Sequence, residues 1–295
     1  MKYNYSIGDC PAYEEHLKKQ KSIVRFLVFI SLAFVIVIMG AGVGSAVACD
    51  ANMNNSNGYL AGCTFSTSLT LNGTYIINAN MTGSNFIQPT TSNLTFDCNG
   101  STLQGNWTST SVDQPTAFLI NLQSNTTIKN CIINNFYYPV RILDNNYTKI
   151  NNFTVNVNRN LYVDNSSNSI ISDSRFVNAT FEHIFITGSG GSTLTNFSII
   201  NSNFSFNGTG HISVGASALA SNMNISYNSF TDAGSGGAIE LTNLTNSYIM
   251  YNNFNSVKSN ASNSKGIYSA NGSNNNFSYN NFTNDNGLSY DIWLN

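Results

Sequence analysis

The residues in this sequence that are best suited to chemistry are Glu182, His183, His211 and Glu240. Each histidine directly precedes a short apolar segment, the two histidines lie 28 residues apart, and Glu240 lies within a third such segment. If these segments stack on one another, the two imidazoles can share a proton or bind a metal. The alternative is an exposed polar row that includes Arg141, which fits the same spacing. It is favoured because a metal site needs a third ligand at good geometry.

Acidic residues are too sparse for the sequence to predict a catalytic pair of carboxyl groups. From residue 49 onward the chain has 11 acidic and 7 basic side chains, with no Asp-Asp or Asp-x-Asp pair. Glycoside hydrolysis needs two carboxyl groups about 5–9.5 Å apart. The formal net charge of this region is 7 − 11 = −4, which gives nucleic-acid binding no electrostatic basis. We expect no cofactor, no bound metal and a role other than catalysis.

Three tyrosines form a second candidate site. Tyr227, Tyr251 and Tyr279 hold equivalent positions in the last three units of a repeat, so they can form one aromatic stack. If the rings face solvent, they are candidates for ligand binding. If they face inward, they belong to the core.

The elements that position these residues come from a repeat of two apolar residues five positions apart, with polar residues between them. Repetition at 20–30 residues is typical of solenoids, in which each unit must stack on its neighbours to bury a core. The seven pairs are Ile128/Ile133, Ile150/Val155, Ile171/Phe176, Ile199/Phe204, Ile225/Phe230, Ile249/Phe254 and Phe277/Phe282.

The fold predicted from this repeat is all-β, a single-stranded right-handed parallel β-helix over residues 93–295. Each unit holds a further apolar segment of three to six residues, such as Leu161-Tyr162-Val163, and no unit has a helical stripe. Asn, Ser, Gly and Thr fill the intervening turns. A β-sandwich is the alternative, but it does not require the same motif seven times in one phase.

Two stretches carry a resemblance to known families. Asn93-Leu-Thr-Phe-Asp-Cys-Asn-Gly-Ser-Thr-Leu-Gln-Gly105 resembles the first coil of many secreted right-handed β-helix proteins. Gly266-Ile-Tyr-Ser-Ala-Asn-Gly-Ser-Asn-Asn-Asn-Phe-Ser-Tyr-Asn-Asn-Phe-Thr283 is similar to the repeat of the periplasmic copper-binding family associated with nitrous-oxide-reductase maturation. That family in turn resembles carbohydrate-binding and sugar-hydrolase β-helices. The motif residues stack coils, so the resemblance implies fold more than chemistry.

Asparagine dominates the composition, with 50 residues in 295. From residue 49 onward there are 20 Asn-X-Ser/Thr sequons, against roughly 12 from random placement. The excess favours N-glycosylation of a translocated chain, although turns also favour these residue types. The predicted sites are Asn72, Asn93, Asn106, Asn125, Asn146, Asn165, Asn178, Asn207, Asn243, Asn260 and Asn271.

The N-terminal region predicts a membrane anchor. Residues 26–48 carry no charge, are long enough to span a bilayer and follow four basic residues. We expect residues 1–25 to be a cytoplasmic tail, 26–48 a single-pass signal-anchor, and the β-helix to lie outside the cell. Cleavage after Ala48 would instead give a secreted protein.

The cysteines predict a stapled cap. Cys10 lies on the cytoplasmic side, whereas Cys49, Cys63, Cys98 and Cys131 lie outside and allow three pairings. The favoured pairing is Cys49–Cys63 with Cys98–Cys131. Residues 49–92 would then be an irregular, disulfide-stapled cap on the first coil.

Together these features predict a membrane-tethered, glycosylated, non-catalytic surface protein that binds polysaccharide or other envelope proteins. The first alternative is a polysaccharide lyase or glycoside hydrolase of the same fold. The second is a maturation factor for a periplasmic metalloenzyme, which rests on the repeat resemblance.

Overall fold

The structure, a computed structural model, describes the chain from Val47 onward with gaps. The described residues are 47–48, 59–60, 63–71, 75–77, 87–105, 116–157, 161–188, 193–205, 210–215, 217–231, 237–255, 265–283 and 290–295. Residues 1–46 lie outside this range, and with them most of the predicted anchor, although Val47 and Ala48 form a short strand. Within the described residues, no helix is long and apolar enough to cross a membrane.

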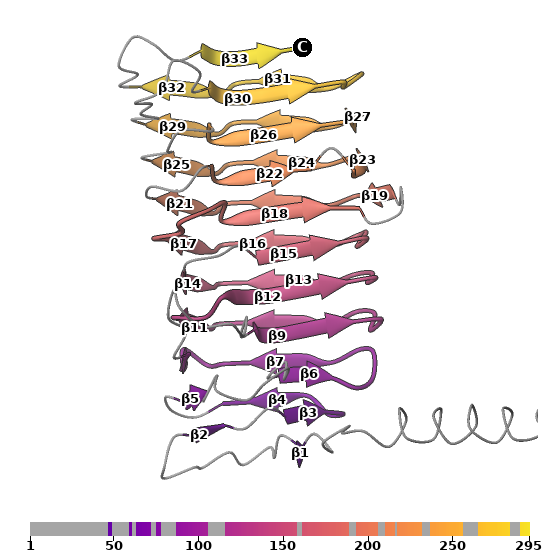
Figure 1. Cartoon of the computed structure of the whole chain (residues 1–295), viewed down its shortest axis with the longest axis vertical. Coiled ribbons are helices and arrows are strands. Elements are labelled where there is room, and N and C mark those ends of the chain that lie inside the picture. The colour runs from indigo at the N-terminus through magenta and orange to yellow at the C-terminus, as the bar shows by residue number, and fades with distance from the viewer. Residues whose placement is uncertain are drawn as a thin grey trace, which may run out of the picture. The chain divides into compact units, whose positions relative to one another are not determined.

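The region from Val47 to Asn295 is a right-handed parallel β-solenoid, as the sequence predicts. Successive strands pass from one sheet to the next, so each sheet gains one strand per coil, and every strand pairing is parallel. The three long sheets of the solenoid are called A, B and C. In Figure 1 sheet A lies in front, sheet C lies behind it, and sheet B runs along the left side.

Sheet A has 11 strands. They are β1 (Val47–Ala48), β3 (Cys63–Phe65), β6 (Ile87–Pro89), β9 (Thr116–Asn121), β12 (Tyr138–Leu143), β15 (Leu161–Asp164), β18 (Ile184–Thr187), β22 (Ile212–Val214), β26 (Ile239–Thr242), β30 (Lys265–Ala270) and β33 (Tyr290–Leu294). Sheet C has nine strands. They are β4 (Leu69–Thr70), β7 (Thr95–Asp97), β10 (Thr127–Lys129), β13 (Lys149–Asn151), β16 (Ile170–Ser172), β20 (Ser198–Ile200), β24 (Asn224–Ser226), β28 (Tyr248–Met250) and β31 (Asn276–Ser278).

Sheet B has ten strands, and a small sheet of three strands widens the connection between sheets A and C. Sheet B contains β2 (Tyr59–Leu60), β5 (Tyr75–Ile77), β8 (Thr102–Gln104), β11 (Ile132–Asn134), β14 (Thr154–Asn156), β17 (Arg175–Val177), β21 (Asn203–Ser205), β25 (Ser229–Thr231), β29 (Asn253–Asn255) and β32 (Asn281–Thr283). The small sheet contains β19 (Thr193–Thr195), β23 (Leu219–Ser221) and β27 (Leu244–Thr245).

The repeated apolar pairs each supply the inward residue of one strand in sheet C and one in sheet B. Ile128 aligns with Ile150, and Ile133 aligns with Val155, and this register continues to the last pair. The predicted column in sheet C is buried from Ile128 to Ile249. Phe277 is only partly buried, because its strand is the last in sheet C and has a neighbour on one side alone.

Two-residue corners join sheet C to sheet B. The first corner residue has a positive φ, as at Asn152 (55°) and Asn201 (50°), and Asn adopts this region more readily than most residues. The second corner residue is buried, as at Ser174 and Ser202, and its hydroxyl accepts or donates a hydrogen bond to backbone in the corner. The abundant Asn and Ser are therefore components of the corners.

The N-terminal segment contributes more regular structure than the irregular cap expected for residues 49–92. Strands β2 to β6 fall in this segment and pair in parallel with sheets A, B and C. A disulfide joins Cys98 to Cys131, one of the two favoured pairs. Cys49 and the side chain of Cys63 lie outside the described residues.

Candidate functional site

The structure brings His183 and His211 together inside the solenoid. Their rings stack with centroids 5.0 Å apart, and the two Nδ1 atoms are 2.8 Å apart. Both side chains are buried, at 3% and 0% exposure, and they pack against Phe204. The expected exposed polar row is therefore wrong for the two histidines, which belong to the core.

Burial keeps this pair neutral. It lowers the pKa of His211 to about 3 and the pKa of His183 well below 6.5, with repulsion from His211 adding to the second shift. The backbone of Thr231 opposes the shift at His211 in part. No hydrogen bond of ordinary geometry from the described residues reaches either Nε2 atom. A pair without solvent access cannot touch a polymeric substrate.

The other members of the predicted cluster lie at different positions. Glu240 aligns with Ser213 and Phe185 in the neighbouring strands. Each of these residues directly follows the first inward residue of its strand, so Glu240 faces outward. Arg141 belongs to this outward register as well, because it aligns with Tyr162 and not with the histidines. Among the described residues, no three His, Cys, Asp or Glu side chains gather where they could hold a metal.

Sheet A carries an outward column that the sequence interpretation missed. Here it is called the sheet A column, and its members align strand by strand across the sheet. They are Leu119, Arg141, Tyr162, Phe185, Ser213, Glu240, Tyr268 and Trp293. The signal was present, since each member from Leu119 to Glu240 lies between two buried apolar residues, but the register was needed to align them.

Arg141 is the polar centre of this column. Its Cζ atom lies 5.3 Å from the ring centroid of Tyr138 and 5.5 Å from that of Tyr162. The Tyr162 ring also packs on Phe185, with centroids 6.0 Å apart. The Nε atom of Arg141 is buried and has no hydrogen-bond partner among the described residues. A guanidinium held by two rings, with its fork of donors, suits a planar anion such as a carboxylate.

The predicted tyrosine stack forms at the corner between sheets C and B. The ring centroids of Tyr227 and Tyr251 are 5.0 Å apart, those of Tyr251 and Tyr279 are 4.8 Å apart, and the planes are within 4° of parallel. The exposures of Tyr227, Tyr251 and Tyr279 are 62%, 44% and 73%. The rings face solvent, but the two faces of Tyr251 are covered by its neighbours. Only the outer faces of the end rings are open for stacking.

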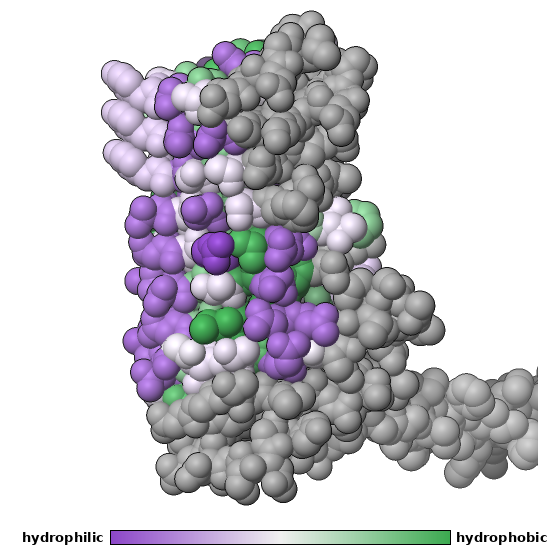
Figure 2. Space-filling model, turned by 90° about the vertical axis from the view of Figure 1, so that its left-hand side faces the viewer, coloured by the Kyte–Doolittle hydropathy of each residue, from purple (hydrophilic) through white to green (hydrophobic). Residues whose placement is uncertain are grey.

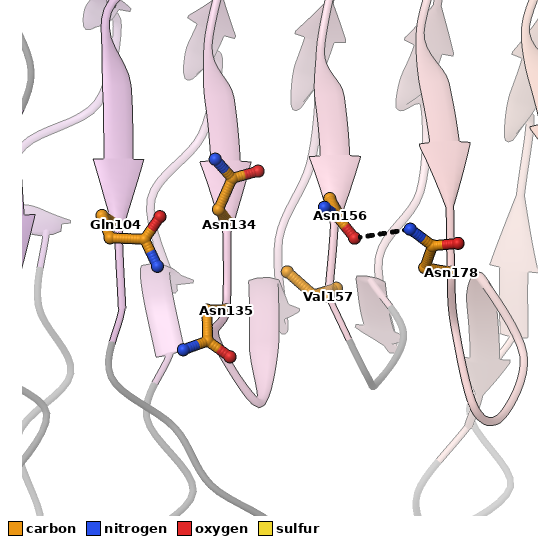
Figure 3. Close-up of a pocket in the computed structure, with 6 residues that line it drawn as sticks. All are labelled: Gln104, Asn134, Asn135, Asn156, Val157 and Asn178. Carbon is orange, nitrogen blue, oxygen red and sulfur yellow. Dashed lines mark hydrogen bonds between the residues drawn. The ribbon is translucent and has the colours of Figure 1, made fainter.

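A pocket of about 300 Å³ opens at the end of the sheet B strands (Figure 3). It is lined by Gln104, Asn134, Asn135, Asn156, Val157 and Asn178. The amide of Asn178 donates a hydrogen bond of 3.0 Å to Asn156. Because the lining has no titratable group, this pocket can accept hydroxyl-rich ligands but cannot transfer protons.

The predicted glycosylation sites lie at corners wherever the structure describes them, except that Asn146 lacks the positive φ. Asn93, Asn125, Asn165, Asn178, Asn243 and Asn271 all have positive φ. Several donate ladder hydrogen bonds through Nδ2, as Asn165 does to Asp144. At two of these sites the hydroxyl residue of the sequon starts the next strand, as Thr95 does after Asn93 and Thr127 after Asn125. The corners therefore account for the Asn residues of these sequons, whether or not the sites are glycosylated.

Comparison with known proteins shows the fold without a family. No protein-family model and no curated protein matches the sequence. Among solved structures, an exopolygalacturonase from Thermotoga maritima is 9% identical, with a TM-score of 0.45 over 72% of this chain and 71% of that one. An alginate lyase from Paenibacillus is 12% identical, with a TM-score of 0.45 over 82% and 93%. The Streptococcus pneumoniae surface protein and adhesin PfbA is 12% identical, with a TM-score of 0.42 over 80% and 90%. The parallel β-helix fold is common to all of them.

This comparison corrects the main functional expectation. The sequence interpretation predicts a non-catalytic surface protein, whereas two of these three structures are polysaccharide-degrading enzymes and one is an adhesin. The prediction of a non-catalytic protein is therefore withdrawn.

Proposed function

We propose that the protein degrades a carboxylated polysaccharide that lies along the sheet A column. The observation that carries this proposal is Arg141, a guanidinium positioned by Tyr138 and Tyr162 whose Nε atom is buried without a hydrogen-bond partner among the described residues. A uronate carboxylate supplies the planar anion that such a group binds.

The dimensions of the column fit an extended chain of sugars. Its members repeat with the strand spacing of about 4.8 Å, which is close to the length of one sugar unit. Arg141 and Glu240 are four strands apart, so they are separated by roughly 19 Å and would contact different sugars. The aromatic members between and beyond them offer ring faces and edges to sugars.

Elimination fits the column better than hydrolysis. Hydrolysis needs two carboxyl groups about 5–9.5 Å apart. Elimination needs the uronate carboxylate to be neutralised, one base to remove the adjacent ring proton, and a proton for the departing oxygen. Arg141 would neutralise the carboxylate, and a water molecule at this solvent-facing column would take the ring proton. Burial raises the pKa of Tyr162, with Asp164 adding to the shift, so its phenol stays protonated and can donate to the departing oxygen.

The test compares carboxylated polymers (alginate and polygalacturonate) with a neutral soluble glucan. We expect the wild-type chain to retard the carboxylated polymers in affinity electrophoresis and to release products with unsaturated, ultraviolet-absorbing ends. Arg141→Gln should reduce both at least tenfold. Lys149→Gln removes one positive charge from exposed sheet C surface and is the matched control. Equal behaviour of the two variants, or no product from any polymer, would contradict the proposal.

The compartment is part of the same proposal. We infer that residues 26–48 anchor or export the chain and that the solenoid works outside the cell. The Cys98–Cys131 disulfide supports this, because such bonds persist mainly in oxidising compartments. Protease treatment of intact cells should remove the solenoid and spare residues 1–25. Protection of the solenoid would contradict an external location.

A further inference from the structure

A hollow of about 360 Å³ lies at the foot of the tyrosine stack. Its wall is the corner column Asp173, Asn201 and Tyr227, and its floor is the aligned sheet B column Arg175, Asn203 and Ser229. The hollow therefore spans three successive coils on the side of the solenoid away from the sheet A column. Figure 2 shows this side, where hydrophilic residues form a band along one edge of the face over sheet B.

Tyr227 changes the character of the corner column. Below it, the corner is an amide and carboxylate ladder in which Asn201 donates a 2.5 Å hydrogen bond to Asp173. Above it, Tyr251 covers one face of the Tyr227 ring. The ring is much larger than Asn201, so it overhangs the hollow and its lower face has no ring against it. Its exposure of 62%, against 44% for Tyr251, reflects this open face.

Arg175 supplies the charge at the other end of the hollow. Its side chain is exposed, and it makes no ion pair with a described residue. Both carboxylate oxygens of nearby Asp173 already accept hydrogen bonds, from Asn151 and Asn201. Arg175 and Tyr227 are two coils apart, a rise of about 9.6 Å, which leaves room for one sugar ring.

We propose that this hollow is a binding site for a single carboxylated sugar. The apolar face of the sugar stacks under Tyr227, its carboxylate pairs with Arg175, and its hydroxyls meet the side chains of Asn203 and Ser229. The site lies on a different face from the sheet A column, so it stands independently of the proposed degradation of polysaccharide.

The test titrates glucuronate, with glucose as the neutral probe, by ligand-observed NMR on the full-length chain carrying Arg141→Gln. That background removes the sheet A column as a competing anion site. We expect glucuronate to bind at least fivefold more tightly than glucose. Arg175→Gln should abolish this preference. Tyr227→Asn, which restores the residue type of the coil below, should weaken both sugars at least fivefold.

Tyr279→Asn is the matched control, because it removes a stacked ring at the far end of the ladder. Thermal unfolding of each variant shows whether its fold is retained. Unchanged binding in either Arg175→Gln or Tyr227→Asn overturns the proposal. An equal loss in Tyr279→Asn, or equal affinity of the parent chain for glucose and glucuronate, overturns it as well.

Discussion

The Nδ1 atoms of His183 and His211 lie 2.8 Å apart in a site without solvent access. At that distance one nitrogen must carry a hydrogen and the other must accept it, so at most one imidazole of the pair can gain a further proton without breaking the contact. The folded state therefore accommodates the pair when both imidazoles are neutral.

Acid should therefore destabilise the protein through these histidines. Their pKa values are lower in the folded than in the unfolded chain, so the stabilisation is complete above about pH 6.5 and falls as the pH drops below that value. For His211, with a folded pKa of about 3, the loss at pH 5 is roughly 2 kcal/mol. Urea unfolding at pH 7 and pH 5 measures this.

A variant carrying His183→Leu and His211→Leu should show a much flatter dependence on pH in the same assay. Phe254→Leu is the control, because it removes buried volume from the same interior without removing a titratable group. If the double variant keeps the wild-type slope, other groups cause the acid sensitivity.

Arg141→Lys should fail to restore the binding of carboxylated polymers. Lysine keeps the charge but lacks the planar group that lies over Tyr138 and Tyr162. We expect binding within threefold of that of Arg141→Gln, and a shallower dependence on salt than the wild type has. Affinity electrophoresis across a salt series checks both, and full rescue by lysine would show that charge alone matters.

The tyrosine stack should stabilise the last coils. Tyr251→Asn removes two ring contacts and should lower the free energy of unfolding by roughly 1–2 kcal/mol. Tyr147→Asn is a close control, since Tyr147 also has a positive φ (59°) and is 59% exposed, but has no ring contact comparable with those of Tyr251. Equal losses in the two variants, measured by thermal unfolding, would show that stacking contributes little.

Substitution in the ladder of Asn228, Asn252 and Asn280 should lower stability more than substitution in the tyrosine stack. The Asn252 amide donates to the Ile225 carbonyl, and its oxygen accepts from the Asn228 backbone. Asn252→Ala leaves both groups without a partner in the interior and should cost roughly 2–4 kcal/mol. Asn276→Ala, at an exposed strand position, should cost far less in the same denaturant titration.

The sequence predicts the coils well because each short strand has one inward residue, so the apolar pairs fix the register directly. The same rule cannot place a residue such as His183. It lies one position outside the regular alternation, where inward and outward sites look alike in sequence. Arg141 also precedes an apolar residue, yet it faces outward and aligns with Tyr162. The aromatic surroundings of Arg141 come from neighbouring coils, and they appear only after the strands are aligned.

The connections from sheet C to sheet B have a fixed length, whereas those from sheet B to sheet A tolerate insertions. Every connection from sheet C to sheet B is two residues long from β10 onward, whereas from β8 onward those from sheet B to sheet A range from three residues, between β11 and β12, to 11, between β8 and β9. Doubling the length of a flexible loop costs only about 0.6 kcal/mol. Evolution or a protein engineer can therefore lengthen the sheet B to sheet A connections and diversify recognition beside the sheet A column, while the corners keep the coils in register.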